Sequence, residues 1–384
     1  MATYTTLPDF TYAAAFNATT NQSTSRDCVI LLDIGFNPFD NPDNILSRQT
    51  SRTVDNIVHG IILPILFFTS TITNSLNMLV SYKHGLKERI NVCIFVLALS
   101  DFIHILFVFL LFLGVNTFVT TTVGRRGILS DFFRKYHLLG LFGIRWFSEF
   151  LTTAIACERC LCVLSPLRSK TVLKTKTLLV VILVACPMVV GAYFVVGLRW
   201  SLECLSVAVV GNQSIAVVHM SKYYLNHQEL VELVDGIIYG FVFPVVFIAT
   251  VAITTILTAH KLSAMAAWRK RASTWGSAAS ISTRDVNLTR MLIGTSVVYI
   301  VCATPCIFRR FLILTVPDFS NVGRYRNVYR VVTIVEMLGS YVNSSVNFFV
   351  YVTLGSKFRE TLRGILRCFP NLKRSMAASN EQTL

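Results

Sequence analysis

The sequence predicts an all-α membrane protein, a bundle of seven transmembrane helices, and two observations support that prediction. Hydrophobic residues make up 53% of the 384-residue chain and charged residues only 14%, against about 25% charged residues in an average soluble domain. A spanning helix needs about 20 mostly apolar residues, and a helix satisfies its own backbone hydrogen bonds in lipid. Seven stretches reach that length: 57–82, 91–115, 136–162, 177–198, 231–259, 290–314 and 328–353.

The loops between these spans indicate the orientation. With the N-terminus outside, the inner side carries more Lys and Arg than the outer side, which the positive-inside rule favours by a modest margin. Three sequons for lumenal glycosylation fall on the same outer side: Asn17, Asn21 and Asn212. We therefore expect a multi-pass plasma-membrane protein with its N-terminus extracellular and its C-terminus cytoplasmic. The net charge of +15 lies in these loops, so no nucleic-acid partner is expected.

The segments outside the bundle have distinct compositions. Residues 1–54 are polar and lack the apolar core of a cleavable signal peptide, so we expect an extracellular glycosylated tail and a first span that acts as the targeting signal. The bundle itself occupies 55–355. Residues 356–369 predict an amphipathic helix on the inner membrane surface, in contact with lipid, with 370–384 as a cytoplasmic tail. Cys368 is a candidate palmitoylation site.

Two of the ten cysteines, Cys28 and Cys204, are clearly external. A disulfide between them is permitted in that compartment. Two free or separately buried thiols are the alternative.

Ionisable residues inside spans are costly in lipid, so each is a candidate functional residue. Asp101 lies in the middle of the second span. Asn343, Asn347 and Tyr351 recur every four residues and form a polar stripe on the seventh span, and Ser148 lies on the third. These positions favour a polar pocket at the bundle centre that holds water or a cation. The alternative is a neutral, hydrogen-bonded Asp101 that only packs helices.

A second polar group lies nearer the outer side. Arg145 and Glu149 are four residues apart on one face of the third span. They form either an ion pair that neutralises itself, or a site in which Arg145 meets a ligand anion and Glu149 orients it. Glu336 is seven residues from Asn343 and therefore on the same stripe of the seventh span.

Several short motifs occur in the order and spacing of one known family. Glu158-Arg159-Cys160 ends the third span, Asn77 and Asp101 lie in the first and second, and Pro244 in the fifth. Cys302-Ala303-Thr304-Pro305 and Asn347-Phe348-Phe349-Val350-Tyr351 lie in the sixth and seventh. Over about 57–369 the chain resembles the rhodopsin-like (class A) G-protein-coupled receptors. The local sequence around the third-span and seventh-span motifs is most similar to that of invertebrate chemosensory and short-neuropeptide (FMRFamide-type) receptors.

The chain also departs from that family. Ala303 replaces a tryptophan, Phe348 replaces a proline, and Ala252 stands where many members have tyrosine. The family usually has a cysteine near the start of the third span that bonds to the cysteine of the second outer loop. No cysteine occurs near that place here, which is at Arg134, so Cys204 pairs elsewhere or stays free. These departures bear on the details of activation and not on the fold.

The resemblance implies a receptor that passes ligand binding to a heterotrimeric G protein, with receptor kinases and arrestin as further partners. The residues implied in coupling and activation are Glu158, Arg159, Leu167, Asp285, Pro305, Asn347 and Tyr351. Arg159 is expected to pair with Glu158 and, at rest, with Asp285, unless Asp285 is only a solvated loop residue. No cofactor is implied except an allosteric sodium ion, at Asp101, Ser148, Asn343, Ser344 and Asn347.

Helical spacing on the third and seventh spans, together with the sixth span just outside Pro305, predicts a ligand cavity between these three spans. Its expected lining is Leu141, Arg145, Glu149, Cys306, Arg309, Glu336 and Tyr341. Tyr341 stands where retinal proteins have lysine, and Leu141 where amine receptors have aspartate, which argues against both ligand classes. Arginines in the outer loops favour a ligand with an anionic group, although they could be solvated or lipid-facing. The expected agonist is a short peptide or a small water-borne molecule. An uncharged odorant is the alternative ligand if the Arg145 charge is fully neutralised by an ion pair with Glu149.

Two other classes compete with a receptor. A transporter usually shows internal repeats and broken helices with charges near the midplane, and we find neither pattern in the sequence. A membrane enzyme needs a catalytic motif, and none occurs in the spans. We therefore expect a receptor and not an enzyme, with a multi-span transporter as the alternative.

Overall fold

The computed structural model describes residues 30–31, 45–113, 128–165, 169, 174–207, 213–273, 283–320 and 323–367. Several expected sites lie outside these residues, namely the three sequons, Cys28, Leu167 and Cys368. The side chains of Cys204 and Asp285 are not described either.

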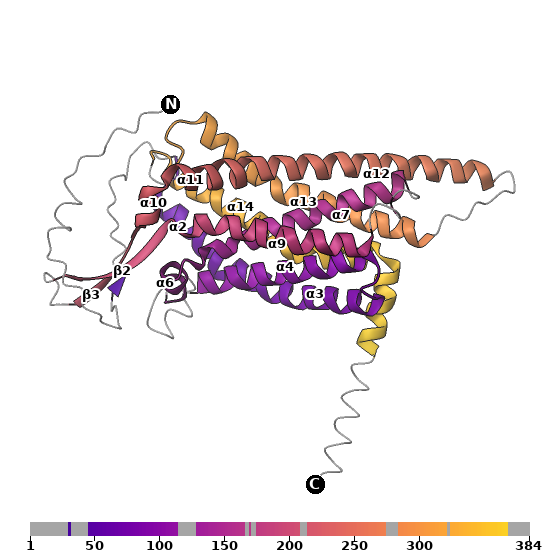
Figure 1. Ribbon diagram of the computed structural model, residues 1–384, viewed down its shortest axis with the longest axis horizontal. Coiled ribbons are helices and arrows are strands. Elements are labelled where there is room, and N and C mark those ends of the chain that lie inside the picture. The colour runs from indigo at the N-terminus through magenta and orange to yellow at the C-terminus, as the bar shows by residue number, and fades with distance from the viewer. Residues whose placement is uncertain are drawn as a thin grey trace, which may run out of the picture.

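The described residues form seven long helical units that run side by side (Figure 1). The prediction of a seven-transmembrane helix bundle is confirmed. Their elements, in order, are α2 Arg48–Ile57, η1 Val58–Ile62 and α3 Leu63–His84; α4 Arg89–Phe112; η3 Leu138–Phe142 and α7 Gly143–Leu164; α9 Thr175–Gly197; α11 Gln228–Glu232, η5 Leu233–Val242 and α12 Phe243–Ser273; α13 Thr283–Thr315; and α14 Arg326–Leu354.

Three units are clearly longer than the apolar stretches that predict them, and the sixth, α13, begins at Thr283 instead of 290. The first begins at Arg48 instead of 57, because Ser47 caps α2 by accepting a hydrogen bond from the Thr50 backbone N–H. The fifth runs on to Ser273 instead of 259. Its extra turns are rich in Ala and Lys, which favour helix without help from lipid.

Five of the units contain a window long and apolar enough to cross a membrane. The units built on α7 and α14 are not among them, because charged and amide side chains interrupt the apolar runs of these two helices. Both helices have many buried polar residues, including Glu149 on α7 and Glu336 on α14. By contrast, α9 leaves apolar side chains such as Leu183 and Met188 exposed, as a lipid-facing helix does.

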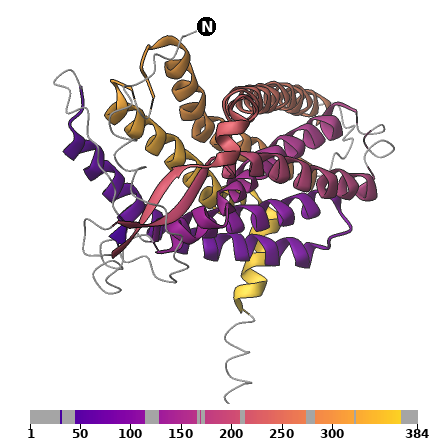
Figure 2. The ribbon, with the colours of Figure 1, turned by 60° about the vertical axis from the view of Figure 1, so that its left-hand side comes forward.

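A three-stranded sheet and short helices lie at one end of the bundle, here called the hairpin end (Figures 1 and 2). Strands β2 Trp200–Val207 and β3 Gln213–Met220 are antiparallel, with Cys204 opposite Ala216. The short β1, Ile30–Leu31, pairs in parallel with the other side of β3. Helices α6 Ile128–Lys135 and α10 Lys222–Asn226 lie at the same end.

Residues 356–367 form a helix at the opposite end of the bundle, here called the tail end (Figure 1). Three of its apolar side chains, Phe358, Leu362 and Ile365, are buried in the main core cluster beside Tyr351. Leu366 is exposed. Most of the apolar face predicted to lie on the membrane therefore packs against the bundle.

Candidate functional site

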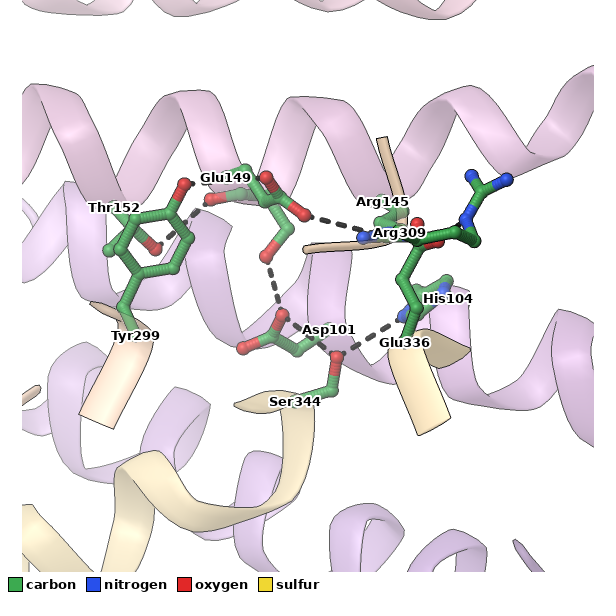
Figure 3. Close-up of polar contacts among 10 residues, drawn as sticks. Asp101, His104, Arg145, Glu149, Thr152, Tyr299, Arg309, Glu336 and Ser344 are labelled. Carbon is green, nitrogen blue, oxygen red and sulfur yellow. Dashed lines mark hydrogen bonds and ion pairs between the residues drawn. The ribbon is translucent and has the colours of Figure 1, made fainter. Parts of the chain in front are cut away.

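The first polar cluster surrounds Asp101, which is fully buried on α4. Three side chains donate to its carboxylate: Ser148 at 2.5 Å, Asn347 at 3.1 Å and Ser344 at 3.3 Å. Nδ1 of His104 lies 3.2 Å from the Ser344 hydroxyl, so these groups point toward one another between α4, α7 and α14 (Figure 3). The second and third spans therefore meet the seventh through one carboxylate.

A small cavity adjoins this cluster, with about 10 Å³ of space for the centre of a water molecule. That is room for about one water or small ion. Asn343, Ser148 and Ser344 line it, so all five residues expected at the sodium site lie on the cluster or the cavity. Their carboxylate, hydroxyl and amide oxygens are hard donors, and this donor set fits a small cation.

His104 is a member of this site that sequence reasoning missed. It is 1% exposed, lines the cavity, and its Nε2 has no hydrogen-bond partner. The available signal was a histidine three residues after Asp101, and therefore on the same helical face.

The second polar cluster is a row of alternating charges, here called the ion-pair chain: Glu149, Arg145, Glu336 and Arg309. Arg145 Nε donates to Glu149 Oε1 at 3.1 Å, and Arg145 Nη1 donates to Glu336 Oε1 at 3.2 Å. Arg309 Nε donates to the other oxygen of Glu336. The chain joins α7, α14 and α13, and its two positive and two negative charges balance.

Tyrosines continue the ion-pair chain at both ends. Tyr299 donates to Glu149 Oε2 at 3.3 Å, and Arg309 Nη1 reaches the Tyr329 hydroxyl at 3.4 Å. Glu149, Glu336 and Arg309 are less than 9% exposed. Charge-assisted hydrogen bonds of this kind are strong, and removing one partner leaves a buried charge uncompensated.

The other residues expected at the ligand cavity make no hydrogen bond or ion pair to the ion-pair chain in the described part of the structure. Cys306 packs in an apolar cluster with Trp146 and Tyr239. Tyr341 is 1% exposed beside Leu63 and Ile105, and its hydroxyl lies 3.5 Å from His59 Nε2.

Leu141 packs with another apolar group, beside Phe107 and Leu111. It belongs to the 3₁₀ turn η3. Because such a turn has 3.0 residues per turn, Leu141 is out of phase with Arg145 on the following α-helix.

A third group of charges lies at the tail end of α7. Arg159 pairs with Glu158, as expected. Arg89 on α4 approaches the same carboxylate at 3.6 Å and donates to the Ser169 carbonyl at 2.7 Å. Cys162 also donates to Glu158, at 3.3 Å. Arg89 is the partner that sequence reasoning missed.

Pro305 lies inside α13, between Tyr299 and Arg309 in the chain. A proline within a helix removes the hydrogen bond to the carbonyl four residues earlier and lets the helix bend. Ala303 is buried beside Phe247 and Tyr299. A charge-carrying helix that can bend at its proline thus packs against both α7 and α14.

The sequence pattern of the family described as "7 transmembrane receptor (rhodopsin family)" matches residues 74–351 of this chain. The match spans α3 to α14 and contains both buried polar clusters. A comparison with curated proteins finds no match.

Proposed function

This chain belongs to the rhodopsin family of seven-transmembrane receptors, and from that premise we propose that it passes ligand binding at its hairpin end to a heterotrimeric G protein at its tail end. Members of the family are multi-pass membrane receptors for extracellular ligands. The sequons and the Lys and Arg distribution support an extracellular hairpin end and a cytoplasmic tail end.

The ion-pair chain is the observation that carries this proposal. It ties α13 to α7 and α14 through Glu336, on the hairpin side of Pro305. A ligand that takes over one of these charges changes the balance between two positions of α13. Such a difference in affinity between two states is what a ligand needs to shift their populations.

The charges also bear on the ligand. Since Arg145 and Arg309 already have carboxylate partners, a ligand must offer a competing anionic group, and Glu336 then meets a cationic or amide group. A small zwitterion or a short peptide offers both. We therefore propose a short-peptide or water-borne chemosensory agonist, in keeping with the likeness to invertebrate receptors of those kinds.

The Asp101 cluster and the tail end complete the proposal. A sodium ion held by Asp101, Ser148 and Asn343 would favour the resting arrangement of α4, α7 and α14. G-protein binding would require Arg159 to leave Glu158. Receptor kinases and arrestin are the further partners proposed for the tail end.

A ligand screen with a second-messenger readout tests this function. Cells that express the chain are exposed to short peptides and to small polar molecules, and each active compound is then tested for nucleotide exchange on G protein. Arg145→Gln should reduce potency about tenfold or more, because a charge-assisted contact contributes about 1.5–3 kcal/mol.

Arg326→Gln is the matched control, since Arg326 is exposed at the start of α14. Both variants are compared at equal surface expression. An unchanged dose–response curve for Arg145→Gln would make Arg145 structural and favour an uncharged odorant.

A further inference from the structure

Arg310 differs from its neighbours in the outer half of the bundle. It lies on α13, is half-buried, and its Nε is buried without a hydrogen-bond partner. Among the residues that the structure describes, no carboxylate lies within ion-pair distance of its guanidinium. Arg145 and Arg309 pair within the ion-pair chain, and Arg199 pairs with Glu232 and Asp235 at 3.0 Å each.

The guanidinium of Arg310 is held against the fifth helical unit at Gly240. A Cβ at Gly240 would lie 2.7 Å from both Nη atoms of Arg310, so a side chain at this position would displace the guanidinium from its present place. Gly240 belongs to η5, a ten-residue π-helical segment. Such segments are rare and often mark functional sites. Arg310 therefore points into the contact between α13 and η5.

An unpaired cation in this position is costly. Arg310 is within a helix apolar enough to span a membrane, five residues from its end at Thr315. Charged side chains within such helices are expensive, and they usually pair or line a site for a charged ligand. The cost is removed when an anion arrives, with no existing ion pair to break.

The surroundings indicate the rest of the ligand. Arg310 lies one helical turn from Cys306, toward the hairpin end. Cys306 packs with the aromatic rings of Trp146 and Tyr239, and Tyr193 meets Tyr239 edge-on at 4.9 Å. A cation at the hairpin-end edge of an aromatic cluster suits a carboxylate attached to an aromatic or apolar body.

We propose that Arg310 is the anchor for a ligand carboxylate, between α13 and η5, and that the ligand's apolar part packs toward the Trp146 and Tyr239 rings. A guanidinium presents a planar fork that matches a carboxylate with two parallel hydrogen bonds. This inference rests on the proposed receptor function and names the ligand class for it.

Thermal unfolding of the purified full chain tests the anchor without G protein. Phenylacetate is the probe and neutral phenylacetamide its matched control. The variants are Arg310→Gln and, as a control for charge, the exposed Arg326→Gln. Phenylacetate at about ten times its Kd should raise the Tm of the wild-type chain by roughly 2 °C or more.

The shift should be lost in Arg310→Gln and kept in Arg326→Gln, and phenylacetamide should produce none. Without any probe, Arg310→Gln should raise the Tm, because it removes an unpaired charge. An equal phenylacetate shift in Arg310→Gln, or no shift in the wild type at tens of millimolar, would overturn the proposal. So would a fall in the ligand-free Tm of Arg310→Gln. A missing nucleotide-exchange response would instead count against the receptor function and leave this binding result standing.

Discussion

Replacing Glu336 with Gln removes the carboxylate at the centre of the ion-pair chain. Glu336 accepts from both Arg145 and Arg309, while Arg145 keeps Glu149 as a second partner. The variant therefore leaves one positive charge in excess among buried side chains. Breaking a buried pair in this way costs about 3–5 kcal/mol of stability. At about 1.2 °C per kcal/mol for a chain of this length, the Tm should fall by roughly 4–6 °C.

A double-mutant cycle separates this effect from a general loss of packing. Arg309→Gln alone leaves one negative charge in excess and should cost a similar amount. The double variant Glu336→Gln/Arg309→Gln keeps the balanced pair of Arg145 and Glu149. Its cost should be smaller than the sum of the two single costs by about 2–3 kcal/mol.

Unfolding can be followed with a thiol-reactive fluorophore on the purified chain, because Cys93, Cys160 and Cys306 are buried in the folded state. Arg326→Gln serves as the control for a change in net charge alone. Additive costs, or an unchanged Tm for Glu336→Gln, would refute the claim that these residues form a coupled chain.

Two further predictions concern the other polar groups. Sodium should lower agonist affinity relative to a bulky organic cation at equal ionic strength. Asp101→Asn should abolish the difference, because it removes the carboxylate that accepts from Ser148, Ser344 and Asn347. A sodium effect that survives in Asp101→Asn would contradict the assignment. Asp285→Ala should raise ligand-free second-messenger signalling if this residue holds Arg159 at rest. Unchanged basal signalling at equal surface expression would instead mean that Glu158 holds Arg159 without Asp285.

The spans could be predicted because their signal is local. An apolar run of sufficient length specifies a membrane helix whatever its neighbours are. The ends of α2 and α12 could not be predicted in the same way, since the cap at Ser47 and the Ala-rich turns before Ser273 extend helices beyond the apolar runs. The match to the rhodopsin family confirms the family and leaves the finer invertebrate subtype a proposal.

Helical spacing by itself predicts polar contacts only within one helix or one stripe, and the grouping of Asp101 with residues of α7 and α14 was expected from the family resemblance instead. Arg145 and Glu149 are four residues apart, so their pairing follows from helical spacing. The contacts of Glu336 with Arg145 and Arg309 depend on how three helices are rotated against one another, and sequence spacing does not contain that information.

Three residues show the same limit in different ways. The 3₁₀ turn η3 shifts the phase of Leu141, which packs among phenylalanine side chains and not beside the charges. Tyr341 shares the seventh-span helix with Glu336 but faces the first span. Arg309 and Arg310 are adjacent in the chain but differ in their contacts. A rotation of about 100° per residue directs Arg309 to Glu336 and Arg310 to Gly240.

The most direct test of the account is ligand-free nucleotide exchange. Purified wild-type chain and Glu336→Gln, each in lipid nanodiscs with the same heterotrimeric G protein, are compared for the rate at which bound GDP is replaced. If the ion-pair chain holds α13 against α7 and α14 at rest, Glu336→Gln should exchange several-fold faster than the wild type. Arg326→Gln is measured as the control for a change in net charge. If folded wild type and folded Glu336→Gln exchange GDP at equal rates, the claim that the ion-pair chain controls the receptor is contradicted.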